Sequence, residues 1–110
     1  MKMDEEGHLL RIFVGENDKS GHIPLYEAIV LKAREAGLAG ATVTRGVMGF
    51  GGKSVLHTAK ILRLSEDMPM IIEIVDSLER IETFLPTLDD LVQEGLVTLE
   101  KVRVIHYRPK

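Results

Sequence analysis

The sequence predicts an α+β domain of the ferredoxin-like type, a βαββαβ sandwich whose antiparallel sheet carries two helices on one face. Segments with strand and helix periodicity follow one another in the order β-α-β-β-α-β, which is the order of this fold. The length of 110 residues suits a single domain. The absence of Cys excludes a disulfide scaffold. We therefore expect one domain over residues 1–110, with residues 1–8 as a flexible N-terminal lead-in.

The first strand and the first helix have the plainest patterns. Residues 9–14 alternate in hydrophobicity, which is typical of a strand with one buried face. Residues 15–21 are rich in turn-forming residues and indicate a loop. A helical apolar stripe then runs over residues 24–36. Pro24 suits the first helical position, and Gly37 suits the left-handed residue that follows a helix.

The middle of the chain holds the next two strands. The β-branched residues within 41–48 favour a strand. Residues 49–54 contain three glycines and predict a loop without regular structure. Alternation over residues 59–64 indicates an additional ribbon. Residues 70–75 are almost continuously apolar, which predicts a central strand.

The second helix and the last strand complete the domain. Asp76 and Ser77 can both cap the helix. Pro86 lies inside the helical pattern and should kink or divide the helix, because it removes a backbone donor. The last strand is predicted over residues 97–107. Its apolar phase shifts part-way, which predicts a bulge near Glu100.

Two of the predicted strands are apolar on both faces. These are residues 9–14 and residues 70–75. A sheet with both helices on one side leaves its other face uncovered. Because an uncovered apolar face normally meets a partner, we expect an oligomer in which the sheets pack on each other.

Composition excludes several classes of function. The net charge of −3 and a pI of about 5.8 provide no basic field for nucleic acid. No apolar run approaches the roughly 20 residues of a membrane span, so we expect no direct membrane insertion. The acidic N-terminus does not suit a signal peptide. A cytoplasmic location is therefore expected.

The Gly-rich segment over residues 46–54 is the first candidate site. Glycines let backbone N–H groups turn toward an anion, and Lys53 can neutralise a phosphate. The spacing is not that of a Walker P-loop. A flexible loop between two strands is the alternative. Six cations surround this segment or lie on the last strand, and ordinary surface charge is the alternative for them: Arg45, Lys53, Lys60, Arg63, Lys101 and Arg103.

Metal and catalytic sites are not indicated. The four histidines have no close spacing, so we expect surface positions and no metal. No Ser-His-Asp arrangement or paired carboxylates are implied by spacing, so we expect no enzyme and no required cofactor. The histidines are His8, His22, His57 and His106.

Four segments carry a resemblance to a known family. They are LRIF at residues 10–13, GLAGATV at 37–43, GFG at 49–51 and HTAKIL at 57–62. Together they resemble the PII signal proteins and, most closely, the PII-like group called domain of unknown function 190. The resemblance covers residues 9–106.

The resemblance implies a ferredoxin-like subunit in a homotrimer whose sheets face inward. It also implies an adenine nucleotide in the clefts between subunits and a loop that relays the bound state to a regulated protein. Loop composition, neighbouring charge and the resemblance together select these nucleotide-binding residues: Thr42, Thr44, Arg45, Gly49, Phe50, Gly51, Gly52, Lys53 and Lys101.

One departure from the PII pattern affects the expected ligand. PII proteins have Gly-Asp-Gly before the lysine that Lys101 matches, whereas this chain has Thr98, Leu99 and Glu100. Fewer backbone donors and one added carboxylate favour AMP or ADP over ATP. The leading hypothesis is a trimeric regulatory protein that binds an adenine nucleotide. The alternative is a ligand-independent trimeric interaction module that modulates a membrane transporter or channel.

Overall fold

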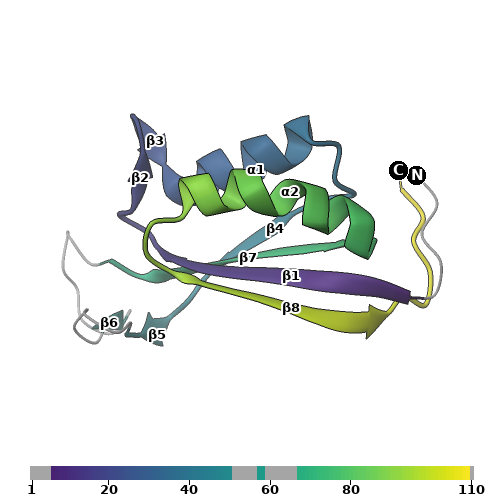
Figure 1. Ribbon diagram of the computed structural model, residues 1–110. Coiled ribbons are helices and arrows are strands. Elements are labelled where there is room, and N and C mark those ends of the chain that lie inside the picture. Colours follow the sequence, from purple (N-terminus) through teal and green to yellow (C-terminus); the bar gives the residue numbers. More distant parts are fainter. Residues whose placement is uncertain (1–5, 51–56, 59–66, 110) are drawn as a thin grey trace.

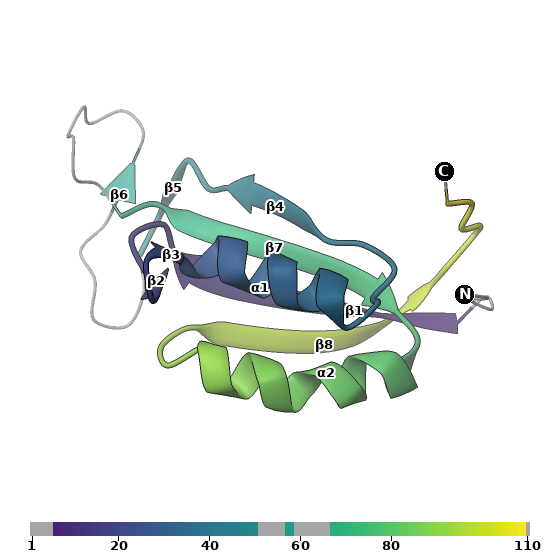
Figure 2. The ribbon, with the colours of Figure 1, turned by 90° about the horizontal axis from the view of Figure 1, so that it is seen from above.

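The computed structural model describes residues 6–50, 57–58 and 67–109. Its main element is a four-stranded antiparallel sheet in the order β4-β7-β1-β8. Both helices lie on the same face of this sheet, and this arrangement confirms the predicted fold class (Figures 1 and 2). The elements of the sandwich are β1 (Glu6–Gly15), α1 (Leu25–Glu35), β4 (Thr42–Arg45), β7 (Pro69–Asp76), α2 (Leu78–Leu91) and β8 (Leu96–Arg103).

The core lies between the helices and one face of the two central strands. Residues of β1 and β7 that are buried alternate with residues that are half-buried, as the sequence periodicity predicts for β1. Cross-strand pairs on the helix side, such as Leu10 with Ile74 and Ile12 with Ile72, are fully buried. The helices contribute the opposing side chains: Leu25, Ile29, Ala33, Ile81, Phe84 and Leu88.

Helix α1 begins and ends as the sequence predicts. Pro24 occupies the position before Leu25. Gly37 has a φ of +75°, a conformation that favours glycine over residues with a side chain. The N–H of Gly37 donates to the carbonyl of Arg34 (3.0 Å), and the N–H of Leu38 donates to the carbonyl of Ala33 (3.1 Å). These two bonds form a Schellman motif, which satisfies carbonyls at the end of the helix.

Helix α2 has the predicted cap at Ser77, but it is not divided at Pro86. Ser77 is the N-cap, and its Oγ accepts from the N–H of Arg80 (3.4 Å). Asp76 is instead fully buried and accepts from the N–H of Ser77 (2.7 Å) and the N–H of Ala39 (2.9 Å). The helix continues through Pro86, so the predicted division is wrong. Pro86 removes one backbone bond, but buried side chains on both sides of it hold the helix against the sheet.

The N-terminal region contains more regular structure than predicted. Strand β1 begins at Glu6, because Glu6 pairs with Arg103 and His8 pairs with Lys101 of β8. The predicted loop after β1 holds two short paired strands, β2 (Lys19–Ser20) and β3 (Ile23–Pro24). Residues 6–8 are therefore part of the sheet and not of a flexible lead-in.

The last strand is shorter than predicted and has no bulge at Glu100. Its register with β1 is continuous, with Glu100 opposite Leu9 and Lys101 opposite His8. The change in apolar phase arises because Leu99 lies on the helix side of the sheet and Val102 on the other side. Apolar residues on both faces of one regular strand therefore produced the change in apolar phase that predicted a bulge.

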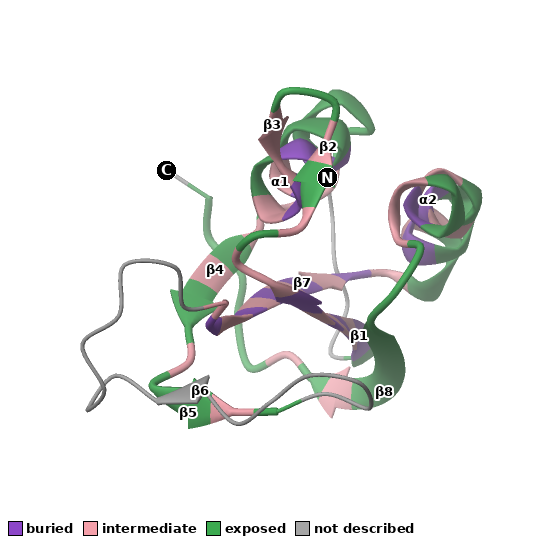
Figure 3. Ribbon diagram, turned by 90° about the vertical axis from the view of Figure 1, so that its left-hand side faces the viewer, coloured by how far each residue is buried: buried purple, intermediate pink, exposed green. Residues whose placement is uncertain are grey.

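The face of the sheet opposite the helices is called the open face below. Neither described helix lies on it (Figures 1 and 3). Its apolar members are half-buried or exposed: Leu9, Phe13, Ile71, Val75, Leu96 and Val102.

Candidate functional site

Most of the described candidate residues gather at one end of the sheet. This is the end where β1 and β4 finish and β7 and β8 begin (Figure 1). A short hairpin of β5 (Met48–Gly49) and β6 (His57–Thr58) extends from it, with Gly49 paired to His57. The strand predicted over residues 41–48 is thus interrupted at residues 46–47, and Gly49, which was predicted to begin an irregular loop, belongs to β5. The candidates Gly51, Gly52 and Lys53, and the ribbon predicted over residues 59–64, lie outside the described residues.

Two glycines hold this hairpin against Pro69. A Cβ on Gly46 would lie 2.6 Å from Cγ of Pro69, and a Cβ on Gly49 would lie 3.1 Å from the same atom. The N–H of Gly46 also donates to the carbonyl of Pro69 (2.7 Å). Gly46 is therefore required by a close backbone approach to the first residue of β7.

The two candidate threonines lie side by side on the open face. Thr42 is paired with Glu73 and Thr44 with Ile71, and both threonines are exposed. They can donate and accept hydrogen bonds toward a molecule that lies on the open face.

Arg45 belongs to the other face of β4 and has an acidic partner. Its Nε donates to Oε2 of Glu16 across 3.0 Å, and both side chains are partly exposed. Glu16 directly follows β1 and is distant from Arg45 in the sequence, so no sequence pattern predicted this ion pair. A phosphate at Arg45 would compete with Glu16 for the guanidinium.

Two further carboxylates lie near this end of β1. Asp18 accepts from the N–H of Gly15 (2.9 Å), and Asp67 accepts from the N–H of Asn17 (2.7 Å). The negative charges of these carboxylates and of Glu16 repel an anion, and this repulsion increases with the anion's own charge. The described surroundings therefore suit a ligand with fewer phosphates better than a triphosphate.

The hairpin presents three exposed apolar side chains. Phe50 is 75% exposed, and Val47 and Met48 are also exposed. The sequence pattern of this segment indicated backbone donors and gave no sign of its apolar surface. Periodicity cannot assign a face to such short strands. An exposed aromatic ring can stack on a nucleobase or pack against a protein.

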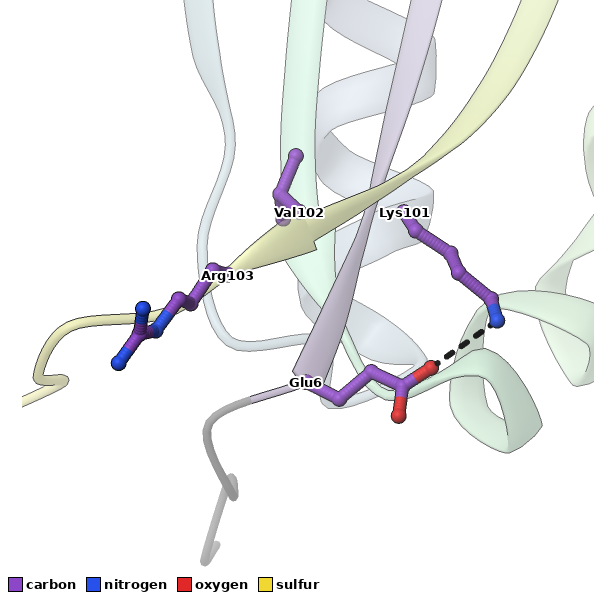
Figure 4. Close-up of a pocket in the computed structure, with 4 residues that line it drawn as sticks. All are labelled: Glu6, Lys101, Val102 and Arg103. Carbon is purple, nitrogen blue, oxygen red and sulfur yellow. Dashed lines mark ion pairs between the residues drawn. The ribbon is translucent and has the colours of Figure 1, made fainter.

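Lys101 does not join the other candidates within one chain. It lies in the interior of β8, five residues beyond Leu96, which is roughly 17 Å along a strand. Its Nζ pairs with Oε1 of Glu6 across 3.4 Å, and Arg103 points away from this pair (Figure 4). Lys101 can therefore reach a ligand at Gly49 only from another subunit.

The histidines were expected at the surface. His22 and His106 are exposed, but His8 is only 9% exposed and lies on the helix side of β1. Within the described residues, no group of three or more His, Cys, Asp or Glu side chains is arranged to hold a metal ion. Of the helices in this part of the chain, neither has the length and hydropathy to cross a membrane.

The sequence matches one family model over most of its length. The model is domain of unknown function 190, described as "Uncharacterized ACR", and it matches residues 7–104. The chain belongs to this family. The match confirms the resemblance that the four sequence segments carry.

Relatives with similar sequences span nearly the whole chain. A UPF0166 protein from Aquifex aeolicus (strain VF5) is 38% identical over 89% of this chain and 92% of its own length. A UPF0166 protein from Methanocaldococcus jannaschii is 35% identical over 87% of this chain and 89% of its own length.

Solved structures with little sequence identity share the PII-like fold. CPII, a nitrogen regulatory PII-like protein from Thiomonas intermedia K12 bound to ADP, AMP and bicarbonate, aligns with a TM-score of 0.61 and 18% identity. The alignment covers 90% of this chain and 88% of CPII. CutA from Synechococcus elongatus PCC7942 aligns with a TM-score of 0.59 and 13% identity, over 92% of this chain and 79% of CutA.

Proposed function

We propose that this chain is a non-catalytic regulatory protein that assembles as a homotrimer and binds AMP or ADP in the clefts between its subunits. The observation that carries the proposal is the open face, where no described element covers the apolar side chains of the three longer strands. Sheets that pack through this face bury those side chains and create clefts at the sheet ends.

Residues at the hairpin end support an adenine nucleotide as the ligand. The PII-like neighbour CPII was solved with ADP and AMP, and its fold matches most of this chain. In this chain, Arg45 can bind a phosphate, the backbone at Gly49 can approach it closely, and the exposed Phe50 ring can stack on a base. The nearby carboxylates favour AMP or ADP over ATP.

The ion pair between Arg45 and Glu16 suggests how the ligand acts. A phosphate that binds the Arg45 guanidinium displaces Glu16, and the ion pair that joins β4 to the end of β1 is then broken. The hairpin with Val47, Met48 and Phe50 can then adopt a different position and present a different surface to a regulated protein. Only a ligand with different affinities for the two positions shifts this equilibrium.

Calorimetric titration tests the proposal. The purified protein is titrated separately with AMP, ADP, ATP and cyclic di-AMP, and its oligomeric state is measured by sedimentation. We expect AMP or ADP to bind, and Arg45→Ala to weaken binding by about tenfold or more, because it removes a charge-assisted hydrogen bond. Lys32→Ala is the matched control, since it removes an exposed cation on α1.

A second variant tests whether the site spans two subunits. Lys101→Ala should weaken nucleotide binding only if a neighbouring subunit brings Lys101 to the Gly49 end of the sheet. No heat and no thermal shift with any of the four nucleotides would reject the ligand. A stable trimer without ligand binding would favour the ligand-independent interaction module, in which the exposed hairpin contacts a transporter or channel.

A further inference from the structure

A groove runs between α2 and β8 on the side of the sheet away from β4. Its apolar lining comes from both elements, and two carboxylate side chains lie on its rim, those of Glu82 and Asp89. Its volume is about 570 Å³. Figure 2 shows α2 running alongside the outer edge of β8. The apolar lining comprises Leu85, Pro86, Leu88, Val92, Gly95 and Val97.

The floor of the groove is apolar yet poorly covered. Val97 and Leu99 lie on the helix side of β8 and pair with Ile12 and Leu10, which are fully buried. Val97 nevertheless remains 40% exposed and Leu99 remains 41% exposed. Most of β8 is therefore exposed, as the colour of its ribbon shows (Figure 3).

Strand β8 also has a free edge. Among the described strands it pairs with β1 alone, and it stands last in the sheet order. Its eight residues contain no Pro and no Gly, so they form a regular edge. The backbone N–H and C=O groups along its outer side form a template for an added strand.

The charge around the groove selects the partner's chemistry. Helix α2 carries four carboxylates and one guanidinium. That guanidinium, Arg80, turns away toward the carbonyl of Gly37 and the carboxylate of Asp76. The last turn holds Asp89 and Asp90 and no basic residue, which is unfavourable because the C-terminal end of a helix is already partly negative. A cationic partner would relieve this repulsion.

We propose that this groove binds an extended segment of a partner protein in which every second side chain faces α2, and these side chains include both apolar residues and lysine or arginine. The segment adds as a strand to the outer edge of β8. Its apolar side chains enter the space between Val97 and Leu85, and its cations face Glu82 and Asp89. The proposal rests on the groove, the edge and the charge, and it does not depend on nucleotide binding.

A synthetic peptide that repeats valine, threonine, lysine and threonine, as long as β8, provides the probe, because its valines and lysines then lie on the same face of the added strand. Its binding is followed by fluorescence anisotropy at low and high salt. We expect binding that weakens with salt, since exposed charges contribute to it. A matched peptide with glutamate in place of lysine should bind at least about tenfold more weakly. A peptide with N-methylated backbone nitrogens should lose binding, because it cannot pair with β8.

Protein variants locate the binding site. Val97→Arg places a cation in the groove and should abolish binding of the peptide. The double variant Glu82→Gln with Asp89→Asn should weaken it about threefold to tenfold, and both of its changes lie at exposed positions that leave the core intact. Glu27→Gln on α1 removes one exposed carboxylate elsewhere and should leave binding unchanged.

Four outcomes would overturn the proposal. They are no peptide binding at about 1 mM, equal binding of the glutamate peptide, equal binding by the N-methylated peptide, or unchanged binding by the double variant. Sedimentation gives a further check. If Val97→Arg converts an oligomer to monomers while the helical circular dichroism is retained, the groove is occupied by a second copy of this chain instead.

Discussion

Ile71 and Ile72 are neighbours in β7, yet they belong to different environments. Ile72 is fully buried beneath the helices, whereas Ile71 lies on the open face and is only half-buried. The same alternation runs along β1, where Ile12 and Phe13 show the same contrast. One set of residues therefore stabilises the subunit, and the alternate set remains available for assembly.

The open face also differs from the core in its charge. Arg11 lies in its middle and contacts Glu73 at 2.9 Å and Glu100 at 3.3 Å. The helix side has no such group among its central residues, where apolar side chains fill the space. A charged group within an apolar face restricts which surfaces can pack against it, because each charge must keep a partner when it is buried.

The largest expected effect comes from comparing the two isoleucines. Ile72→Ala should lower the free energy of unfolding by about 2–5 kcal/mol, because it leaves a cavity in a core that cannot fully collapse. Ile71→Ala should have a smaller effect on a dilute subunit and should weaken assembly. Urea unfolding at several protein concentrations separates the two. Equal losses that do not depend on concentration would contradict the division between the faces.

Arg11→Ala tests the charged centre of the open face. It leaves Glu73 and Glu100 without their cation, so packing of sheets through this face should weaken by at least about tenfold in dissociation constant, or about 1.4 kcal/mol. Sedimentation over a concentration series measures the change. Lys32→Ala, which removes an exposed cation on α1, is the control and should leave assembly intact.

Ser77→Ala tests the helix side of the sheet separately from the open face. It removes the side-chain cap of α2 and should lower the free energy of unfolding by about 1 kcal/mol. The open face is not altered, so the dissociation constant of the assembly should stay the same. Thermal unfolding and sedimentation on one sample check both parts, and a change in assembly alone would be inconsistent with this role.

Tyr107→Phe should have the smallest effect. The hydroxyl of Tyr107 donates to the carbonyl of Ala39 across 3.3 Å in an exposed position. Its loss should lower the free energy of unfolding by about 0.5 kcal/mol or less, since water can replace the donor. Chemical unfolding resolves a change of this size only with matched samples. A loss above about 1.5 kcal/mol would show that this contact has a larger structural role.

The fold could be predicted because its signals are periodic and local. Alternation in β1 identified its buried face, the continuous apolar run of β7 identified a central strand, and the position of Gly37 identified the end of α1. The prediction of a bulge at Glu100 was wrong because hydropathy alone does not reveal that Val102 faces the open side. The start of β1 was placed too late because Glu6 is held by pairing with β8 and not by its own propensity.

The candidate site was only partly accessible from the sequence. Arg45 and Gly49 were selected together as candidates because they lie close together in the chain. The partner of Arg45 was missed because Glu16 comes from a distant loop. Lys101 was grouped with them by its match to a loop lysine, but apolar and β-branched neighbours such as Val97 and Leu99 extend the strand through that position.

The contact of Gly46 and Gly49 with Pro69 has a mechanical consequence. Pro69 is the first residue of β7, so the hairpin is joined directly to the strand that carries both environments. A displacement of the hairpin must either break the bond from Gly46 to Pro69 or pull on β7. Ile71 lies two residues further along β7, on the open face, and would be displaced together with Pro69. A displacement of the hairpin that keeps this bond would therefore also move a residue of the open face.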